Sequence, residues 1–353
     1  MSQPLLDIRD LSRDYQSQPL IGTPHVTKAL DRVSLGVTAG EIVGIVGESG
    51  CGKSTLARLV MALDRPTTGQ VLFDGDDLFA LPPSELKRRR ENFQMVFQDP
   101  YGSLDPRQTV GRIVAEPLHV LANRLTRAQI QDRVADILAS VGLDPGHTSR
   151  YPHEFSGGQR QRIAIARALV TEPKLVVADE PVSALDLSVQ AQVLNLLMDL
   201  REKRGVTFLF ISHNLAVVDS IADRVGVMYR GRIVEIGPAE AVFDAPLHPY
   251  TRQLADAEPS VTRFGRPPAR PAAATLDGRA ASGCAFAARC PLAVPLCLEK
   301  SPELRAVTPD RQAACHRAED MLTDPNRGSA KGHLFSRQVL CDERGMSGHG
   351  RPS

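Results

Sequence analysis

The chain has 353 residues, and its 42 Lys and Arg against 41 Asp and Glu give a formal net charge of +1. A near-neutral chain argues against extensive nonspecific binding to nucleic acid or anionic lipid, so no nucleic-acid partner is expected. No stretch approaches about 18 consecutive apolar residues, and the N-terminus has no signal-peptide pattern. The chain is therefore expected to stay in the cytoplasm and to reach a membrane only through partners.

Apolar periodicity predicts an α/β protein in which a strand-rich core carries a helical insert. Helices are predicted at Val110–Leu121 and Arg127–Val141, with Gly142 as the stop of the second. The segment Gln16–Thr27 looks like an insertion. Strands are predicted near Leu5–Ile8, Val33–Val37, Ile42–Val46, Val71–Phe73, Phe93–Phe97, Leu175–Ala178, Phe208–Ile211, Val225–Tyr229 and Ile233–Ile236.

The first motif in the chain is a glycine-rich loop at residues 47–55, placed between a predicted strand and a run with helical spacing. It fits the pattern of two glycines closing on Gly-Lys-Ser. Because loop N–H groups and a helix N-terminus converge on anionic oxygens, we expect a nucleotide phosphate site. Lys53 would reach the β- and γ-phosphates, and Ser54 would place its hydroxyl on Mg²⁺. The expected cofactor-binding residues here are Gly47, Ser49, Gly50, Cys51, Gly52, Lys53, Ser54 and Thr55.

A second phosphate-binding element is predicted where Ser156-Gly157-Gly158-Gln159 precedes a helix rich in arginine. The glycines would expose N–H donors at the positive end of that helix. One nucleotide needs only one cradle, and this element lies about a hundred residues after the lysine loop. The arrangement therefore suggests that two chains share each nucleotide.

Two carboxylates end the apolar run Leu175–Ala178 just before Pro181 stops the strand. Carboxylates at the C-terminal edge of a strand suit a metal ion. Asp179 is expected to bind Mg²⁺ directly or through water, and Glu180 to polarise the water that attacks the γ-phosphate.

With these motifs in this order, the chain resembles the nucleotide-binding subunits of ABC transporters from about Leu5 to about Pro259. By that resemblance residues 47–55 are the Walker A motif and residues 155–159 the signature, while Asp179 and Glu180 close Walker B. The resemblance also implies ATP and Mg²⁺ as cofactors and Lys53 and Glu180 among the catalytic residues.

The same resemblance assigns roles to four residues that would mean little alone. Gln98 is the Q-loop glutamine, a catalytic residue and Mg²⁺ ligand; Asp186 ends the D-loop, which starts at Ser183. His213 is the switch histidine that contacts the γ-phosphate, and Asn214 after it replaces the aspartate of many relatives with little expected loss. Tyr15 is the expected adenine-stacking aromatic, with a core or surface tyrosine as the competing interpretation.

The implied fold is a P-loop NTPase core of the ABC ATPase type, with a mixed sheet, an antiparallel β subdomain and a helical insert, followed by a small cysteine-containing extension. We predict an ATPase domain at 1–259, with a helical subdomain at about 100–170, an extension at 260–320 and a disordered tail at 321–353. A linker is predicted to begin at Pro246. Residues 101–110 are where a membrane subunit is expected to dock.

Four of the six cysteines, Cys284, Cys290, Cys297 and Cys315, lie in the extension with five, six and seventeen residues between them. Disulfides are disfavoured in a reducing cytoplasm. Zinc usually draws on Cys-x-x-Cys turns, which are missing, whereas thiolates on longer loops can hold an iron–sulfur cluster. This extension resembles that of a subfamily of ABC ATPases whose members are associated with such clusters, so a 4Fe-4S cluster is expected ahead of zinc. Four unbonded thiols are the remaining alternative.

The His-Pro-Tyr run at 248–250 and the cysteine segment resemble the C-terminal extension of dipeptide, oligopeptide and nickel importer ATPases, and residues 97–101 and 155–162 match the second, F-type ATPase of such importers. This implies an ATPase that drives peptide import from the cytoplasmic face of the inner membrane, where it would be peripheral. Its partners would be a second, homologous ATPase, two permease subunits and an extracytoplasmic binding protein. The alternatives are import of a nickel chelate or glutathione, a soluble ABC ATPase acting on nucleic acid or ribosomes, and a nucleotide-sensing regulatory ATPase.

Overall fold

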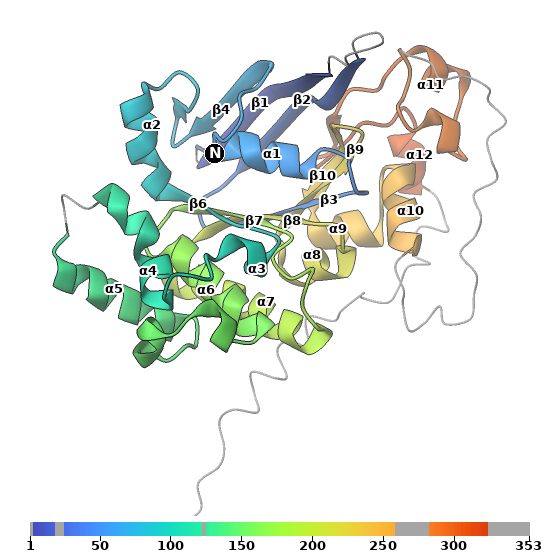
Figure 1. Ribbon diagram of the computed structural model, residues 1–353. Coiled ribbons are helices and arrows are strands. Elements are labelled where there is room, and N and C mark those ends of the chain that lie inside the picture. Colours follow the sequence, from blue (N-terminus) through green and yellow to red (C-terminus); the bar gives the residue numbers. More distant parts are fainter. Residues whose placement is uncertain (1–2, 18–24, 122–124, 258–281, 324–353) are drawn as a thin grey trace, which may run out of the picture. The chain divides into compact units, whose positions relative to one another are not determined.

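The computed structural model describes residues 3–17, 25–121, 125–257 and 282–323 (Figure 1). The chain divides into two compact units. The first comprises residues 1–13, 34–42 and 54–211, and the second comprises residues 14–33, 43–53 and 212–353. Among the described residues, no helix combines the length and the apolar character needed to span a membrane.

The first unit contains three parallel strands: β6 (Phe93–Val96), β7 (Leu175–Asp179) and β8 (Thr207–Ser212). β7 lies between the other two, with Leu175 in register with Phe93 of β6 and Thr207 of β8. Every side chain of β7 and β8 is buried. Continuous burial is typical of parallel strands covered on both faces, and it explains why these runs are uniformly apolar.

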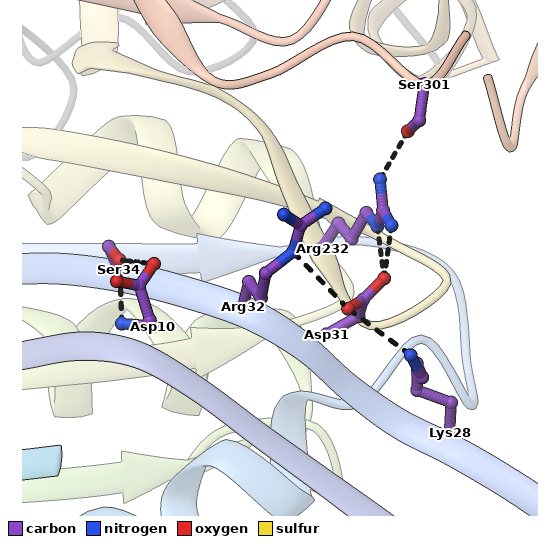
Figure 2. Close-up of polar contacts among 7 residues, drawn as sticks. All are labelled: Asp10, Lys28, Asp31, Arg32, Ser34, Arg232 and Ser301. Atoms are coloured by element: carbon purple, nitrogen blue, oxygen red, sulfur yellow. Dashed lines mark hydrogen bonds and ion pairs between the residues drawn. The ribbon is translucent and has the colours of Figure 1, made fainter. Parts of the chain in front are cut away.

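An antiparallel sheet has the strand order β2-β1-β4-β5, formed by β1 (Leu6–Ser17), β2 (His25–Val37), β4 (Thr68–Phe73) and β5 (Asp76–Asp77). β1 and β2 are much longer than predicted, and both ends of the supposed insertion Gln16–Thr27 are strand. The Asp10 N–H donates to Ser34 Oγ at 2.9 Å (Figure 2). Periodicity missed these extensions because strand pairing uses backbone groups and does not require apolar side chains.

The described elements between β6 and β7 are all helical. α4 ends at Ala115 and a 3₁₀ turn follows, because Pro117 has no N–H for an α-helical bond. α5 begins at a Thr126 capping box and is followed by Gly142 at φ +73°, as predicted. The helices of the first unit (α1 also includes Lys53 of the second) are α1 (Lys53–Val60), α2 (Pro83–Arg89), α3 (Pro100–Ser103), α4 (Val110–Ala115), α5 (Arg127–Ser140), α6 (Gly157–Leu169) and α7 (Leu187–Arg204), with 3₁₀ turns η1 (Arg90–Asn92), η2 (Glu116–Leu121), η3 (Pro145–Ser149) and η4 (Pro152–Glu154).

The second unit is built on five strands in the order β11-β12-β10-β9-β3. β3 and β9 are parallel and the other pairs antiparallel. The strands are β3 (Ile42–Val46), β9 (Arg224–Tyr229), β10 (Arg232–Pro238), β11 (Arg305–Thr308) and β12 (Arg311–Ala313). The helices are α8 (Leu215–Ile221), α9 (Ala239–Asp244), α10 (Pro249–Ala257), α11 (Pro295–Glu299) and α12 (Ala318–Thr323), with the 3₁₀ turn η6 (Ala287–Arg289). β11 and β12 were not predicted because strands of four and three residues are too short to show an apolar pattern.

The predicted linker at Pro246 is wrong up to Ala257, because this stretch is folded. The buried Glu235 carboxylate accepts from the Leu247 N–H at 2.8 Å and from the His248 N–H at 3.0 Å. It also pairs with buried Arg311 at 2.7 Å. Removing one partner of such a buried ion pair costs about 3–5 kcal/mol, so this network fixes β10, β12 and the start of α10 together. The rest of the predicted linker and almost all of the predicted tail lie outside the described residues.

His248 should make the stability of the protein sensitive to acid. Its Nδ1 accepts from the Tyr250 N–H at 3.0 Å, and burial lowers its pKa to about 3. Between the unfolded pKa of about 6.5 and the folded value, the unfolded chain binds a proton that the folded chain does not. The free energy of unfolding therefore decreases by about 1.4 kcal/mol for each unit by which the pH is lowered. Urea unfolding at about pH 5 and about pH 7.5 should show a loss of about 2 kcal/mol from this group.

His248→Asn is the control variant, because it keeps a side-chain acceptor for the Tyr250 N–H but does not titrate. Its loss of stability on acidification should be smaller by that amount. Equal pH dependence in the two proteins would show that His248 is not the group responsible.

Candidate functional site

The glycine-rich loop lies in the second unit, directly after β3. The Lys53 ammonium is buried and donates to the backbone oxygens of Gly47 at 2.7 Å and Glu48 at 3.1 Å. Ser49, Gly50 and Ser54 are exposed, and Thr55 is half-buried. The lysine thus closes the loop on itself while the middle of the loop faces solvent, as a phosphate cradle requires.

Two glycines give the loop its path because other backbone comes very close to them. At Gly47, with φ +155°, an added Cβ would lie 2.2 Å from the Met228 oxygen. At Gly52, with φ +112°, it would lie 2.5 Å from the Ala29 oxygen. No side chain fits at either position, so β2 and the end of β9 determine the shape of the loop.

Cys51 is packed inside the loop. It is buried, its oxygen accepts from the Gly231 N–H at 2.8 Å, and its Sγ lies 3.9 Å from Lys53 Nζ. Burial raises the pKa of its thiol, so the group is protonated at neutral pH and is a poor nucleophile.

Glu48 has contacts that the sequence did not indicate. Its carboxylate accepts two hydrogen bonds from Arg289, at 3.1 and 2.9 Å, and its backbone N–H donates to the Tyr250 hydroxyl at 3.0 Å. All of these residues belong to the second unit. No motif links Arg289 or Tyr250 to the loop, and only the fold brings them to it.

In the first unit, the structure brings together Gln98 and Glu180. The Gln98 amide donates from Nε2 to Glu180 Oε2 at 3.0 Å. Glu180 has a left-handed backbone, with φ +48°, and its N–H donates to the Ile211 oxygen of β8 at 2.8 Å. Such a conformation is unfavourable for a residue with a Cβ and is typical of sites where function dictates the backbone. Asp179, the last residue of β7, is buried beside it.

The predicted second phosphate element is the N-terminus of α6. Ser156 and Gln159 form a capping box in which the Ser156 N–H donates to Gln159 Oε1 at 3.0 Å and Ser156 Oγ accepts from the Gln159 N–H at 3.4 Å. Gly157 and Gly158 form the first turn of the helix. Ser156 and Gln159 are exposed, so this helix end presents polar groups to solvent.

The remaining predicted residues lie at the ends of secondary-structure elements or within a strand. Asp186 is exposed at the N-cap of α7, and His213 is exposed after β8. Asn214 caps α8, with Oδ1 accepting from the Val217 N–H at 3.0 Å. Asparagine caps helices about as well as aspartate, which accounts for its presence here. Tyr15 is half-buried in β1.

The four cysteines of the extension do line one cavity, which measures about 10 Å³, roughly the room of one water molecule. Burial raises the pKa of Cys284 and Cys290, and that of Cys315 to about 12, so these thiols are protonated. Within the described part of the chain, no group of three or more His, Cys, Asp or Glu side chains is arranged to hold a metal ion. The expected 4Fe-4S cluster is therefore not supported.

Comparison with family models gives two matches. Residues 30–183 match the ABC transporter family, and residues 234–297 match the C-terminal region of oligopeptide/dipeptide transporters. The second match contains Tyr250 and Arg289, the residues that bond to Glu48.

Similar proteins include a putative peptide import ATP-binding protein of Brucella ovis, 48% identical over 89% of this chain and 98% of its own length. The di/tripeptide transport ATP-binding protein DppF of Pseudomonas aeruginosa is 47% identical over 90% of this chain and 99% of its own. Among solved structures, the ATP-binding cassette MJ0796, a dimer in a post-hydrolysis state with ADP and Pi, matches with a TM-score of 0.59 and 30% identity, over 66% of this chain and 98% of that one.

Gly158 is expected to tolerate no side chain because of α7. A Cβ there would lie 2.5 Å from Val189 Cγ1, so Gly158→Ala should lower the free energy of unfolding by about 1–3 kcal/mol through overpacking. Gly157→Ala is the matched control, since its Cβ would meet only the Tyr101 hydroxyl at 3.3 Å and Leu185 at 3.7 Å.

Urea unfolding of both variants, alone and with Val189→Ala, measures this effect. Removing the valine methyl groups should reduce the cost of Gly158→Ala to below about 1 kcal/mol. A cost that is the same in both backgrounds would show that the contact with Val189 is not what excludes a side chain.

Proposed function

We propose, from the premise that this chain belongs to the ABC transporter ATP-binding proteins and carries the oligopeptide/dipeptide transporter C-terminal region, that it powers the import of di- or oligopeptides. The activity is ATP hydrolysis coupled to transport. The observation that carries the proposal is the presence of both family regions in one chain, with the whole set of nucleotide motifs in order. The similarity to peptide-transport ATPases at 47–48% identity favours peptides as the cargo over a nickel chelate or glutathione. It also favours transport over an action on nucleic acid or ribosomes.

In this proposal the phosphates of ATP bind the loop at 47–55, with Lys53, oriented by the loop carbonyls, reaching the β- and γ-phosphates. The exposed Ser54 hydroxyl, the Asp179 carboxylate and the Gln98 side chain are oxygen ligands of the kind that Mg²⁺ prefers. A bound Mg²⁺ would neutralise charge that develops on the phosphate oxygens. Tyr15 is proposed to stack on the adenine.

Glu180 is the proposed general base. It is half-buried at the end of β7, and the Gln98 amide holds one of its carboxylate oxygens. The carboxylate would orient the attacking water and accept its proton, while His213 would contact the γ-phosphate. Because the Gln98 amide donates to Glu180, movement of the Q-loop would change the position of the Glu180 carboxylate.

We propose that the nucleotide is shared with a second, homologous ATPase, packed head to tail. The capped N-terminus of α6 would face the γ-phosphate held by the partner's loop. Support comes from the exposed surface beside it: Asp186 and Leu187 project at the start of α7, and Leu187 is 74% exposed.

The proposed membrane partners are two permease subunits, supplied with cargo by an extracytoplasmic binding protein, and the chain would lie at the cytoplasmic face of the inner membrane. Tyr101 is 56% exposed, with Arg160 stacked on its ring at 4.5 Å. A groove of about 800 Å³ runs along α4 and α5. Its lining includes Gln108, Arg112 and Glu116, which follow Tyr101 closely in the sequence. These features support docking at residues 101–110.

Glu180→Gln should leave ATP binding intact and slow hydrolysis by about 10²–10⁴-fold, because the amide cannot accept the proton of the attacking water. Steady-state ATPase rates and equilibrium binding of a fluorescent ATP analogue separate the two effects. Glu202→Gln, at an exposed position of α7, is the matched control and should hydrolyse ATP normally. Hydrolysis at the wild-type rate in Glu180→Gln would remove Glu180 from the proposed role.

Purification of the tagged chain from detergent-solubilised membranes tests the partners. The proposal expects two polytopic permeases and a second ATPase of the same family to co-purify. Recovery with nucleic acid or ribosomal proteins, and without permeases, would contradict the transport function.

A further inference from the structure

We propose that Arg289 and Tyr250 are positioning residues for the phosphate loop, through which the C-terminal region sets the affinity of this ATPase for ATP. Both act on Glu48, the second residue of the loop. Arg289 holds its carboxylate with two hydrogen bonds, and the Tyr250 hydroxyl accepts from its backbone N–H.

The contacts matter because they act on the peptide unit that also holds the lysine. The Glu48 N–H points to Tyr250, while the backbone oxygens of Gly47 and Glu48 accept from the Lys53 ammonium. Rotation of this part of the backbone would displace the carbonyl groups that orient Lys53. Fixing Glu48 on one side therefore keeps the loop in a single conformation before nucleotide arrives, which lowers the entropic cost of binding.

Tyr250 is a rigid support. Its side chain is fully buried, its ring lies 4.5 Å from that of Tyr229 and 5.5 Å from that of Phe286, and burial raises the pKa of its hydroxyl, so it stays neutral. The hydroxyl oxygen is thus held in place because the Tyr250 ring packs against two other aromatic rings, and it cannot follow the loop if the loop moves.

Arg289 is also restrained. Its guanidinium lies 5.5 Å from the centre of the Phe286 ring and 5.8 Å from that of Tyr229. The backbone N–H of Arg289 donates to the backbone oxygen of Phe286 at 3.0 Å. The same region of the chain is anchored further on, where Ser301 bonds to Arg232, which pairs with Asp31 of β2 (Figure 2). The two hydrogen bonds of the Arg289 fork fix direction as well as distance.

The ion pair is too exposed to be a stability element. The Arg289 and Glu48 side chains are 40% and 44% exposed, and pairs of that kind contribute little to folding. Its position on the loop, and not its strength, is what gives it a role.

The test compares Arg289→Ala, Arg289→Lys and Tyr250→Phe with the wild-type chain. Arg305→Ala is the matched control, because Arg305 forms the same two-bond pair with Glu319 in the same region of the chain. The readouts are equilibrium binding of a fluorescent ATP analogue, the KM and kcat of ATP hydrolysis, and urea unfolding. Binding is measured on the isolated chain, so the result does not depend on the cargo or the partners.

Arg289→Ala and Tyr250→Phe should each weaken ATP binding and raise KM by about 3- to 10-fold, with kcat changed less than about two-fold and the unfolding midpoint nearly unchanged. Arg289→Lys, which keeps the charge but loses the fork, should fall between Ala and wild type. Arg305→Ala should match wild type. Unchanged or tighter ATP binding in Arg289→Ala, or weaker binding that simply follows a loss of stability, would overturn the proposal.

Discussion

The phosphate loop can follow its path because glycine stands at two points where other backbone comes within contact distance. The oxygens of Met228 and Ala29 occupy the space that a Cβ of Gly47 or Gly52 would need. The loop is therefore shaped by β9 and β2, and Lys53 completes it by bonding to the carbonyls of the loop. Every chemical role proposed for this chain depends on that backbone, because phosphate is bound mainly by N–H groups that the backbone aims.

The C-terminal region is part of this support. It adds β11 and β12 to the strands of the second unit and contains the buried Glu235–Arg311 pair. It also supplies Tyr250, which packs against Phe286 and whose hydroxyl accepts a hydrogen bond from the Glu48 N–H. A region that pairs β12 with β10 and bonds to the phosphate loop is well placed to influence ATP binding. Its four cysteines line one small cavity in the same region, with Cys290 and Cys297 buried and Cys284 and Cys315 partly buried.

Much of the site could be predicted from the sequence because its residues belong to local motifs with fixed spacing. The loop at 47–55, the strand end at Asp179 and the helix start at Ser156 each form within a short stretch of chain, and each appears as predicted. The pairing of Gln98 with Glu180 and the attachment of Glu48 to Arg289 needed the fold, since they join residues 82 and 241 positions apart.

The strands that the sequence did not predict have a common physical cause. The ends of β1 and β2 and the short strands β11 and β12 are held by backbone pairing, which forms strands even where the apolar pattern is too short or irregular to detect. The prediction of a linker after Pro246 is wrong for a different reason. Prolines are typical of linkers, but Leu247 to Tyr250 are buried through contacts with residues that are distant in the sequence. The cysteine spacing suggested a cluster that the folded arrangement does not support.

If ATP hydrolysis at this site drives peptide uptake, transport itself should depend on Glu180. Cells lacking the gene would be given either the wild-type chain or Glu180→Gln, and uptake of a labelled di- or oligopeptide would be followed. The wild-type chain should restore uptake, and the variant, although present at the same level, should not. Equal uptake with both chains, or uptake that needs neither, would contradict this dependence.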